Sequence, residues 1–486
     1  MTSDPSAPAD VRAIVQRLWS YCHVLKDDGV SYGDYVEQLT FLLFLKMEDE
    51  TVRDANRISK LPKGARWNDL LGLSGLDLEA KYIDVLQILA HQPGVVGRIF
   101  ARAQNKIQDS AKLKRLVTLI DSERWSNMTV DVKGAIYEGL LERNAEDVKS
   151  GAGQYFTPRP LLRAITAAVE PRMGERICDP ACGTGGFLLE SRRFIAERTD
   201  RKTPSGSGRS VYAGVEIVPD TARLCLMSLH LRGITDEEID IRVGDALMSS
   251  PEPIFDVVLT NPPFGRRSSM TFTNESRSDS DRLVYRRDDF VATTSNKQLN
   301  FLQHVMSILA PTGRAAVVVP DGTLSEGGAG EAIRRVLLER FDVHTLLRLP
   351  AGIFYAGSVK SSVLFFDRKP AKSRREAGSI WTYDLRSGHR FSLRSDPLTD
   401  EALTDFVERY GGKGRRARKE SERFKRFAVT EVLASERCSL DIGIIGQGAH
   451  AAQDEPPASI ATDIIDRLEA AADAIRAVEQ QLDERP

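Results

Sequence analysis

The sequence predicts an α/β protein in which a helical N-terminal domain precedes a doubly wound parallel sheet and a helical extension ends the chain. Three observations lead to this fold class. Apolar residues recur at helical spacing up to about residue 150, short apolar runs then alternate with helical segments, and an amphipathic stretch closes the 486 residues. Alternation of strands and helices is typical of parallel sheets that carry helices on both faces.

The N-terminal domain is predicted over residues 1–150. Helical spacing of apolar residues is clearest in residues 11–25, 32–47 and 131–145, and Pro and Gly separate the segments at 62–64 and 93–94. Because few β-branched runs occur in this part of the chain, helices alone are expected.

Residues 151–370 are predicted to form the main α/β domain. Its strand candidates are residues 176–178, 211–215, 239–243, 257–260, 314–319 and 343–349. Two polar inserts interrupt them, at 199–210 and 266–297. Long loops in compact domains are commonly functional, so the second insert is interpreted as a mobile loop that faces the substrate.

Residues 371–458 are predicted to be a mixed basic region that completes this domain, and residues 459–486 a terminal amphipathic helix for subunit assembly. Segment 413–427 holds eight Lys or Arg and two Glu. A solvated surface is the common explanation for such a run, and a patch that contacts phosphates is the alternative. The apolar stripe at 459–482 either packs on its own chain or serves assembly.

Composition limits the classes to which the chain can belong. With a net charge of -2, the chain lacks the overall attraction of a basic protein to nucleic acid. The five cysteines form no Cys-x-x-Cys pair, so neither a disulfide scaffold nor a metal site is indicated. The first residues lack a secretory signal and no apolar run is long enough to span a membrane, which predicts a cytoplasmic protein.

The most informative stretch is Asn261-Pro262-Pro263-Phe264. It follows an apolar run at 255–260, and two consecutive prolines cannot continue a strand, so the chain must turn there. The Asn261 amide oxygen and the Pro262 carbonyl would then form a rigid pair of acceptors, which suits a planar amino group such as N6 of adenine. Phe264 offers a flat face for the ring. A plain turn at the end of a strand is the alternative.

A glycine-rich turn follows the first predicted strand, as Asp179-Pro180-Ala181-Cys182-Gly183-Thr184-Gly185-Gly186-Phe187. Its glycines let the backbone turn sharply beside a ligand, close to helix N–H groups. The Lys-Ser/Thr ending of a phosphate-binding loop is missing, and the dinucleotide pattern Gly-x-Gly-x-x-Gly is not matched. Asp179 would repel a pyrophosphate but suits a cationic ligand.

Acidic residues end three successive predicted strands. Glu216 is placed to accept hydrogen bonds from ribose hydroxyls, and Asp245 from an adenine amino group. Each carboxylate alone is more often a helix cap or a loop residue. Together with Asp179 they predict a pocket for a positively charged nucleoside, and S-adenosylmethionine fits that description.

With both motifs in place, the chain resembles N6-adenine DNA methyltransferases and, more narrowly, the modification (M) subunit of type I restriction-modification systems. The resemblance covers nearly the whole chain. Its further motifs lie at residues 35–40, 153–158, 299–304, 313–322, 352–357 and 359–366. The cofactor turn precedes the target-base motif, as in the gamma arrangement. The implied fold is a Rossmann-like S-adenosylmethionine-dependent methyltransferase domain with a helical N-terminal domain and a C-terminal helical extension.

The resemblance implies two groups of site residues. The cofactor-binding group is Gln154, Tyr155, Phe156, Thr157, Asp179, Ala181, Gly183, Thr184, Gly185, Glu216, Asp245 and Asn261. The catalytic group is Asn261, Pro262 and Phe264, with Phe354 or Tyr355 as a second wall for the target base. Two departures from the family pattern are Ser361, where Thr is common, and the enlarged loop after Phe264.

The implied reaction transfers a methyl group from S-adenosylmethionine to N6 of an adenine in double-stranded DNA. The adenine must first be flipped out of the duplex, which costs roughly a few kcal/mol. Because the chain has almost no net charge and no convincing second DNA-reading domain, a DNA-specificity (S) subunit is expected to choose the sequence. The terminal helix would dock on that subunit. The resemblance also implies a second copy of the M subunit, in an M2S1 complex, and leaves a restriction (R) subunit open.

Two alternatives stay open at this point. Asn-Pro-Pro-aromatic turns also occur in methyltransferases that act on RNA, protein glutamine or cytosine N4. The other alternative is a non-catalytic scaffold or DNA-binding subunit, against which the intact Asp179, Gly183, Gly185, Asn261 and Phe264 argue.

Overall fold

A computed structural model describes residues 16–18, 32–54, 59, 61–123, 157–199, 209–248, 254–264, 287–354, 359–369, 378–386, 391, 397–411 and 415–442 of the chain. Its contacts divide the chain into two compact units. The first, called the helical unit, comprises Met1–Gln154, Cys182–Leu189 and Val211–Gly244. The second, called the sheet unit, comprises Tyr155–Ala181, Glu190–Ser210 and Asp245–Pro486.

The N-terminal part of the helical unit contains helices and no strand among its described residues. Its elements are α2 (Tyr32–Asp54), η1 (Trp67–Asp69), α3 (Gly75–Ala90), α4 (Gly94–Phe100) and α5 (Ser110–Ser122). The predicted helix at 32–47 is confirmed and continues to Asp54. Of the other two predicted helices, 131–145 lies outside the described residues, and of 11–25 only residues 16–18, which are helical, are described.

A βαβ unit belongs to the same compact unit. Strands β2 (Val211–Glu216) and β3 (Ile239–Val243) pair in parallel, joined through α9 (Pro219–Leu231) and η2 (Asp236–Glu238). The buried Arg223 of α9 forms an ion pair with Glu37 of α2 and donates to the carbonyl of Ala101 at 3.2 Å. Helices from the first 123 residues therefore share a core with this βαβ unit. The predicted boundary at residue 150 lies outside the described residues and stays a prediction.

Among its described residues, the sheet unit contains seven strands in the order β1-β4-β5-β7-β6-β8-β9. They are β1 (Arg176–Asp179), β4 (Phe255–Thr260), β5 (Leu309–Pro320), β6 (Phe341–Leu349), β7 (Ser361–Arg368), β8 (Ser379–Asp384) and β9 (Phe424–Ala428). All strands predicted in this part of the chain are confirmed, with ends that differ by a few residues. β8 and β9 come from the mixed basic region predicted after residue 370 and join the same sheet.

The predicted parallel direction is confirmed for the predicted strands β1, β4, β5 and β6, but the sheet also contains antiparallel strands that were not predicted. β7 runs antiparallel to both β5 and β6, and β9 runs antiparallel to β8, whereas β1–β4, β4–β5 and β6–β8 are parallel. The first six residues of β7 are buried without alternation. A continuous apolar run identifies a strand buried on both faces, but it carries no information about strand direction.

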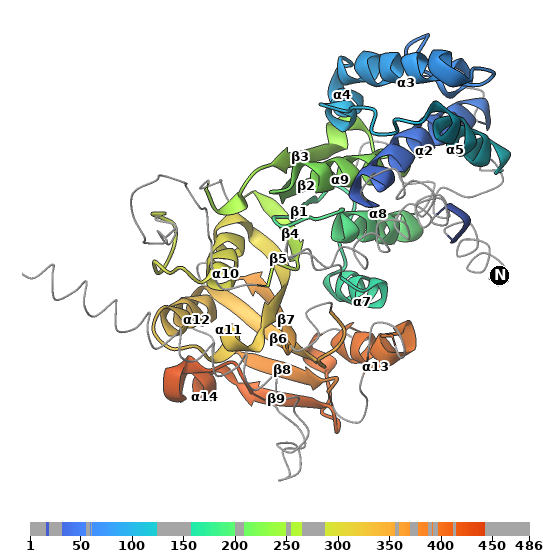
Figure 1. Cartoon of the computed structure of the whole chain (residues 1–486). Helices are drawn as coiled ribbons and strands as arrows, with labels where there is room; N and C mark the ends of the chain where they lie inside the picture. The colour runs from blue at the N-terminus through green and yellow to red at the C-terminus, as the bar shows by residue number, and fades with distance from the viewer. Residues whose placement is uncertain are drawn as a thin grey trace, which may run out of the picture. The chain divides into compact units, whose positions relative to one another are not determined.

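Helices cover both faces of the sheet unit. α10 (Lys297–Ile308) contacts β5 and α12, and α12 (Ala329–Arg340) contacts β6. α7 (Arg159–Val169) contacts β5 and α13, and α13 (Asp400–Gly411) lies with it on the opposite side of the sheet (Figure 1). The remaining short elements are η3 (Ala246–Met248), α11 (Asp321–Ser325), η4 (Arg415–Ala417), α14 (Val429–Ala434) and η5 (Glu436–Cys438), and α8 (Gly186–Arg198) follows the glycine-rich turn.

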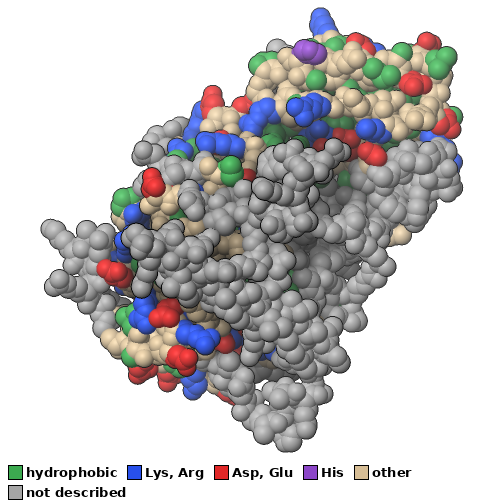
Figure 2. Space-filling view, turned by 60° about the vertical axis from the view of Figure 1, so that its left-hand side comes forward, with side chains coloured by type: hydrophobic (Ala, Val, Ile, Leu, Met, Phe, Trp, Pro, Cys, Tyr) green, Lys and Arg blue, Asp and Glu red, His purple; other side chains and the backbone are tan. Residues whose placement is uncertain are grey.

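The basic run at 413–427 matches neither predicted explanation fully. Arg415 forms an ion pair with Asp367. The guanidinium of Arg418 lies 4.6 Å from the ring centroid of Tyr410 and donates to Thr345 Oγ1 at 2.9 Å, and burial lowers its pKa to about 10. These two arginines therefore hold the sheet unit together. On the face drawn in Figure 2, basic and acidic side chains of the described residues are interspersed.

The described part of the C-terminal region ends in a segment tied to α12. Arg334 of α12 is fully buried and donates to the carbonyls of Cys438 at 3.0 Å, Arg437 at 2.8 Å and Thr323 at 2.9 Å. The predicted terminal helix at 459–482 lies outside the described residues. Among the helices that the structure describes, none is long and apolar enough to cross a membrane.

Candidate active site at the strand ends

The glycine-rich turn has the conformation that its composition predicts. The Gly185 N–H donates to the Cys182 carbonyl at 2.8 Å, and Gly183 and Gly185 have left-handed φ angles of 53° and 89°. A Cβ added at Gly185 would lie 2.8 Å from Cys225 Sγ, whereas one at Gly183 would meet nothing within 4 Å. Gly185 is therefore needed for packing, and Gly183 leaves open space at the turn that suits a ligand.

Glu216 stands at the end of β2 and holds this turn. Its Oε2 accepts from the Gly183 N–H at 3.0 Å, and its Oε1 accepts from the Val218 N–H at 2.9 Å. Burial raises the pKa of Glu216 above its usual value, although the backbone donors act in the opposite direction. Each carboxylate oxygen can accept a further hydrogen bond. The next side chain, Ile217, is 55% exposed and offers an apolar surface beside the carboxylate.

Asp179 and Asp245 use the same local geometry at the ends of their strands. Asp179 Oδ1 accepts from the Ala181 N–H at 3.0 Å, and Asp245 Oδ1 accepts from the Leu247 N–H at 2.9 Å. Glu216 likewise bonds the N–H two residues later, in Val218. All three carboxylates thus shape the turns that follow their strands, as loop residues commonly do. Their roles toward a cofactor stay predictions.

Asn261 lies at the end of β4 with one end of its amide bound. Its Nδ2 donates to Thr157 Oγ1 at 2.9 Å, and the side chain is 8% exposed. Its Oδ1 is buried and has no hydrogen-bond partner among the described residues. An unpaired buried acceptor costs about 1–3 kcal/mol, so such an atom in a native protein calls for a functional explanation. Thr157, predicted as a cofactor residue, is placed against Asn261 by the structure.

Phe264 packs against Phe354. Their ring centroids lie 5.4 Å apart at an interplanar angle of 78°, an edge-to-face arrangement that aromatic pairs favour. Phe354 is almost fully buried and supports the Phe264 ring. Its prediction as a second wall for the base stays untested. The predicted site residues Gln154, Tyr155, Phe156 and Tyr355 lie outside the described residues.

Gln298 contacts the Asn261–Phe264 turn and was not predicted as a site residue. Its Nε2 donates to the Pro263 carbonyl at 3.0 Å. Asn296 caps α10 by accepting from the Gln298 N–H at 3.0 Å, and its Nδ2 donates to Glu326 Oε2 at 2.8 Å. An Asn before an apolar periodic run signals the start of a helix. Nothing local indicates the contact of Gln298 with a residue 35 positions earlier.

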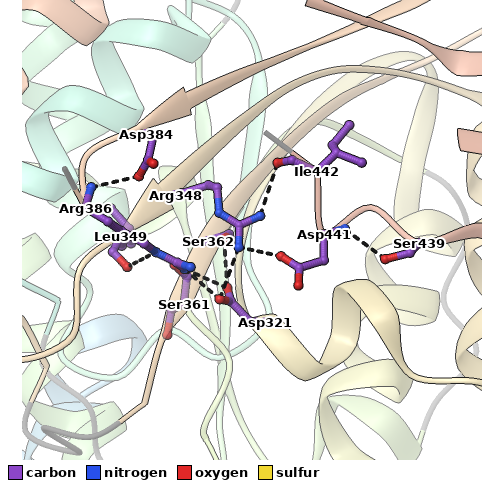
Figure 3. Close-up of polar contacts among 10 residues, drawn as sticks. All are labelled: Asp321, Arg348, Leu349, Ser361, Ser362, Asp384, Arg386, Ser439, Asp441 and Ile442. Atoms are coloured by element: carbon purple, nitrogen blue, oxygen red, sulfur yellow. Dashed lines mark hydrogen bonds and ion pairs between the residues drawn. The ribbon is translucent and has the colours of Figure 1, made fainter. Parts of the chain in front are cut away.

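A charged network at the ends of β5 to β8 was also not predicted. Arg348, Arg386 and Ser362 converge on Asp321, with Arg386 Nη2 at 2.8 Å and Ser362 Oγ at 3.0 Å from Oδ1 (Figure 3). Arg348 is 1% exposed and also forms an ion pair with Asp441. The network joins the ends of four strands to residues 439–442. Because β4 runs parallel to β5, Asn261, which directly follows β4, lies at the same end of the strands.

The two arginines of this network are paired with the carboxylates of Asp321 and Asp441 and also donate to backbone carbonyls. Arg386 Nε donates to the Leu349 carbonyl at 2.9 Å, and Arg348 Nη1 donates to the Ile442 carbonyl at 3.2 Å. Both arginines therefore donate to protein acceptors, and of the Arg348 guanidinium only the buried Nε has no partner among the described residues. These contacts favour a structural role for this network. Among the described residues, no group of three or more His, Cys, Asp or Glu is arranged to hold a metal ion.

Comparison with known protein families gives two matches that together span most of the chain. A model described as N-6 DNA Methylase matches residues 128–451. A model described as the HsdM N-terminal domain matches residues 14–121.

Curated relatives and a solved structure agree with these matches. The methylase subunit of the type I restriction enzyme StySJI from Salmonella typhimurium is 41% identical over 418 residues, 82% of this chain and 76% of the relative. The EcoKI methylase subunit from Escherichia coli is 41% identical over 445 residues, 87% of this chain and 81% of the relative. A solved structure described as the structural basis of complex assembly and conformational transition of the type I R-M system contains a chain that is 25% identical to this one. The two superimpose with a TM-score of 0.72 over 98% of this chain and 99% of that chain.

Proposed function

Because the chain belongs to the N-6 DNA methylase family, as one of the methylase subunits of type I restriction enzymes, we propose that Asn261, Pro262 and Phe264 bind the adenine that it methylates. The chain is an adenine-specific DNA methyltransferase that uses S-adenosylmethionine. Family membership also favours catalysis over the non-catalytic scaffold and over RNA or protein substrates. The predicted α/β methyltransferase fold is confirmed.

The buried, unpaired Oδ1 of Asn261 carries the assignment of the catalytic residue. Thr157 Oγ1 occupies the Nδ2 end of the amide, so the oxygen is the end left for a substrate. An acceptor in a buried site suits a donor that arrives with the substrate, and one N–H of an adenine amino group is such a donor. The Pro262 carbonyl, next along the turn, is proposed to accept the second N–H.

The mechanism then depends on orientation. When bound, S-adenosylmethionine supplies an electrophilic methyl group on a sulfonium sulfur. The N6 lone pair of adenine is delocalised into the ring, which makes this nitrogen a weak nucleophile. Hydrogen bonds from its two N–H groups to two fixed acceptors favour a more tetrahedral nitrogen whose lone pair points at the methyl group. Holding a nucleophile in line in this way is worth about 7–11 kcal/mol. The side chain of Phe264 would hold the flipped base by stacking, and its support by Phe354 keeps that ring in place.

The cofactor is proposed to contact residues of the glycine-rich turn and the strand ends. The open side of Gly183 and the remaining lone pairs of Glu216 fit a ribose with two hydroxyl donors. Ile217, exposed beside Glu216, suits a flat apolar ring. Asp179 suits the cationic end and Asp245 the adenine amino group. Gln154, Tyr155, Phe156, Thr157, Ala181, Thr184 and Gly185 complete the proposed set.

The partners follow from the family. The chain acts on double-stranded DNA together with a DNA-specificity subunit and a second copy of itself, and a restriction subunit associates with such complexes. We further propose that the terminal helix at 459–482 docks on the specificity subunit and that the complex works in the cytoplasm. Recovery of an intact complex after deletion of residues 459–486 would contradict the docking.

The catalytic assignment is tested with the assembled complex and labelled S-adenosylmethionine. DNA that carries the methylation site of the complex is the substrate, and RNA and protein are the comparison substrates. Asn261→Ala is expected to abolish label transfer to DNA, while calorimetric titration still shows binding of S-adenosylmethionine. Full transfer by this variant, or label appearing in RNA or protein and not in DNA, would overturn the assignment.

A further inference from the structure

The Asn261–Phe264 turn has few backbone donors of its own for its carbonyls. Neither Pro262 nor Pro263 has an N–H, so the turn lacks two of the backbone donors that usually close such a structure. The proline rings fix φ at their own positions, whereas the direction of the Pro263 carbonyl depends on ψ, which a donor from another segment can set. Gln298, which is 4% exposed, donates from Nε2 to the Pro263 carbonyl at 3.0 Å.

The donor stands on a well-anchored helix start. Asn296 caps α10 by accepting from the N–H groups of Gln298 at 3.0 Å and Leu299 at 3.3 Å. Its Nδ2 donates to Glu326 Oε2, at 2.8 Å, in the segment between α11 and α12. Because the cap, the first turn of α10 and the Glu326 contact are linked, Gln298 has little freedom to follow the turn if the turn moves.

The contact acts on the peptide group between Pro263 and Phe264. That group carries the Pro263 carbonyl at one end and leads into Phe264, whose ring rests on Phe354 at 5.4 Å. Fixing the Pro263 carbonyl therefore fixes the backbone from which the Phe264 ring projects. It also engages that carbonyl with a protein donor, so that it does not compete with the Pro262 carbonyl for the amino group of a base.

We propose that Gln298 is a positioning residue for the target-base site: through the Pro263 carbonyl it sets the direction of the Pro262 carbonyl and of the Phe264 ring. This inference rests on the proposed role of Asn261, Pro262 and Phe264. The described side-chain hydrogen bond of Gln298 goes to the Pro263 carbonyl, and not to Asn261 Oδ1 or the Pro262 carbonyl, which are the proposed acceptors for the base. Its loss should therefore affect the catalytic step and base stacking and leave binding of S-adenosylmethionine unchanged.

Two substitutions separate the hydrogen bond from the packing. Gln298→Met keeps a similar volume and removes the donor, and kcat for methyl transfer is expected to fall about tenfold, the value of one lost hydrogen bond. Gln298→Glu places a carboxylate against the Pro263 carbonyl and should lower kcat further near pH 8. A protonated carboxyl group donates an O–H, so kcat of this variant should recover relative to the parent as the pH falls toward 6. The Met variant has no such recovery.

A second measurement reports on the base itself. With 2-aminopurine at the target adenine, a flipped base that stacks on an aromatic ring has quenched emission compared with a flipped base that does not. Both Gln298 variants are expected to increase this emission in the assembled complex with its DNA. The affinity for S-adenosylmethionine, measured by calorimetry, should stay within about twofold of the parent.

The matched control is Gln303, a second buried glutamine on the same helix. It accepts from the Ala292 N–H at 2.9 Å and donates to the Ala292 carbonyl at 3.0 Å, away from the catalytic turn. Gln303→Met should lower the melting temperature at least as much as Gln298→Met and leave kcat and the pH profile as in the parent. A common loss of kcat in both Met variants, in proportion to lost stability, would show a merely structural role and overturn the proposal.

Asn261→Ala separates a failure of the proposed base-binding site from a failure of the positioning role of Gln298. If this variant stays active, the proposed site itself is wrong. If it is inactive while Gln298→Met keeps the kcat and the 2-aminopurine emission of the parent, only the positioning role of Gln298 is wrong. Should Gln298→Glu fail to fold, the Met variant with its Gln303→Met control still decides between these outcomes.

Discussion

Thr157 and Asn261 are joined by one hydrogen bond of 2.9 Å, from the Asn261 amide nitrogen to the Thr157 hydroxyl oxygen, across 104 positions of the chain. The bond occupies the nitrogen end of the amide and leaves Oδ1 without a partner among the described residues. Thr157 lies two positions before α7 and Asn261 directly after β4. The orientation of the Asn261 amide thus depends on a segment that the Asn261–Phe264 motif itself does not contain.

Removing the Thr157 hydroxyl should release the Asn261 amide. Thr157→Val keeps the shape and loses the acceptor, so we expect kcat for methyl transfer to fall about tenfold, equivalent to about 1.4 kcal/mol. Thr157→Ser keeps the hydroxyl and should restore most of the activity. Steady-state assays of both variants check this. Equal losses in Val and Ser would show that the methyl group, and not the hydroxyl, matters.

Binding of S-adenosylmethionine should weaken in acid because of Glu216. Burial raises the pKa of this carboxyl, and only the ionised form accepts hydrogen bonds with both oxygens. Affinity is therefore present above that pKa and is lost as the pH falls through it, at a higher pH than for an ordinary Glu. Glu216→Gln should weaken binding about 10- to 100-fold near pH 8 and remove the acid loss.

Calorimetric titrations from pH 5 to 8 measure this effect of Glu216. The control is Asp220→Asn, an exposed carboxylate on the first turn of α9. It should keep both the affinity of the parent and its acid loss. An unchanged acid loss in Glu216→Gln would assign the titration to another group.

His304 should make the fold sensitive to acid. Burial, and Arg287 whose Nη1 donates to His304 Nδ1 at 2.9 Å, lower its pKa to about 3. In the unfolded chain His titrates near 6.5, so between these values the unfolded state binds more protons and stability falls as the pH falls. At pH 4 the loss is about 3 kcal/mol relative to pH 7.

Urea unfolding at pH 4 to 7 measures the effect of His304. His304→Gln keeps an acceptor for Arg287 and should flatten the dependence on pH. The exposed His91, changed to Gln, should leave the dependence as in the parent. A parent curve that is flat over this range would contradict the buried neutral state of His304.

The buried Arg348 should stabilise the sheet unit more than an exposed arginine does. Arg348→Met leaves Asp441 without its ion pair and Asp321 with one arginine fewer, and should cost about 2–3 kcal/mol, reduced because both carboxylates are partly exposed. Arg335→Met on α12 breaks an exposed pair with Glu331 and should change the urea midpoint little. Similar midpoints for the two variants would show that the network carries no stability.

The elements predicted correctly share one property, which is that their signal is local. Apolar runs and the double proline mark β4 and its end, and glycines mark the turn after β1, within a few residues in each case. The direction of a strand within a sheet, in contrast, is not indicated by its local sequence. β7 follows β6 in sequence and inserts between β5 and β6, and nothing within residues 361–368 indicates which way it runs.

The contacts that complete the candidate site could not be predicted for the same reason. Gln298 reaches a carbonyl 35 positions earlier, and Arg348 pairs with a carboxylate 93 positions later. The basic run at 413–427 likewise did not indicate the contacts of its arginines. Arg415 pairs with Asp367 and Arg418 lies over the Tyr410 ring, and only the folded sheet brings these partners near. Residue types alone do not show these partners.

The buried arginines of the sheet unit have a consequence for biosynthesis. Arg334 obtains one of its acceptors from Cys438, 104 positions further on, which a ribosome reaches roughly 5–20 s later. Until then the Arg334 guanidinium lacks the carbonyls of Arg437 and Cys438, and its acceptors within the chain are the carbonyls of Thr323 and Glu326. A chain that stops before residue 437 should therefore have a lower melting temperature than the full chain. Cys438 thus completes the hydrogen bonding of a side chain that is synthesised 104 positions earlier.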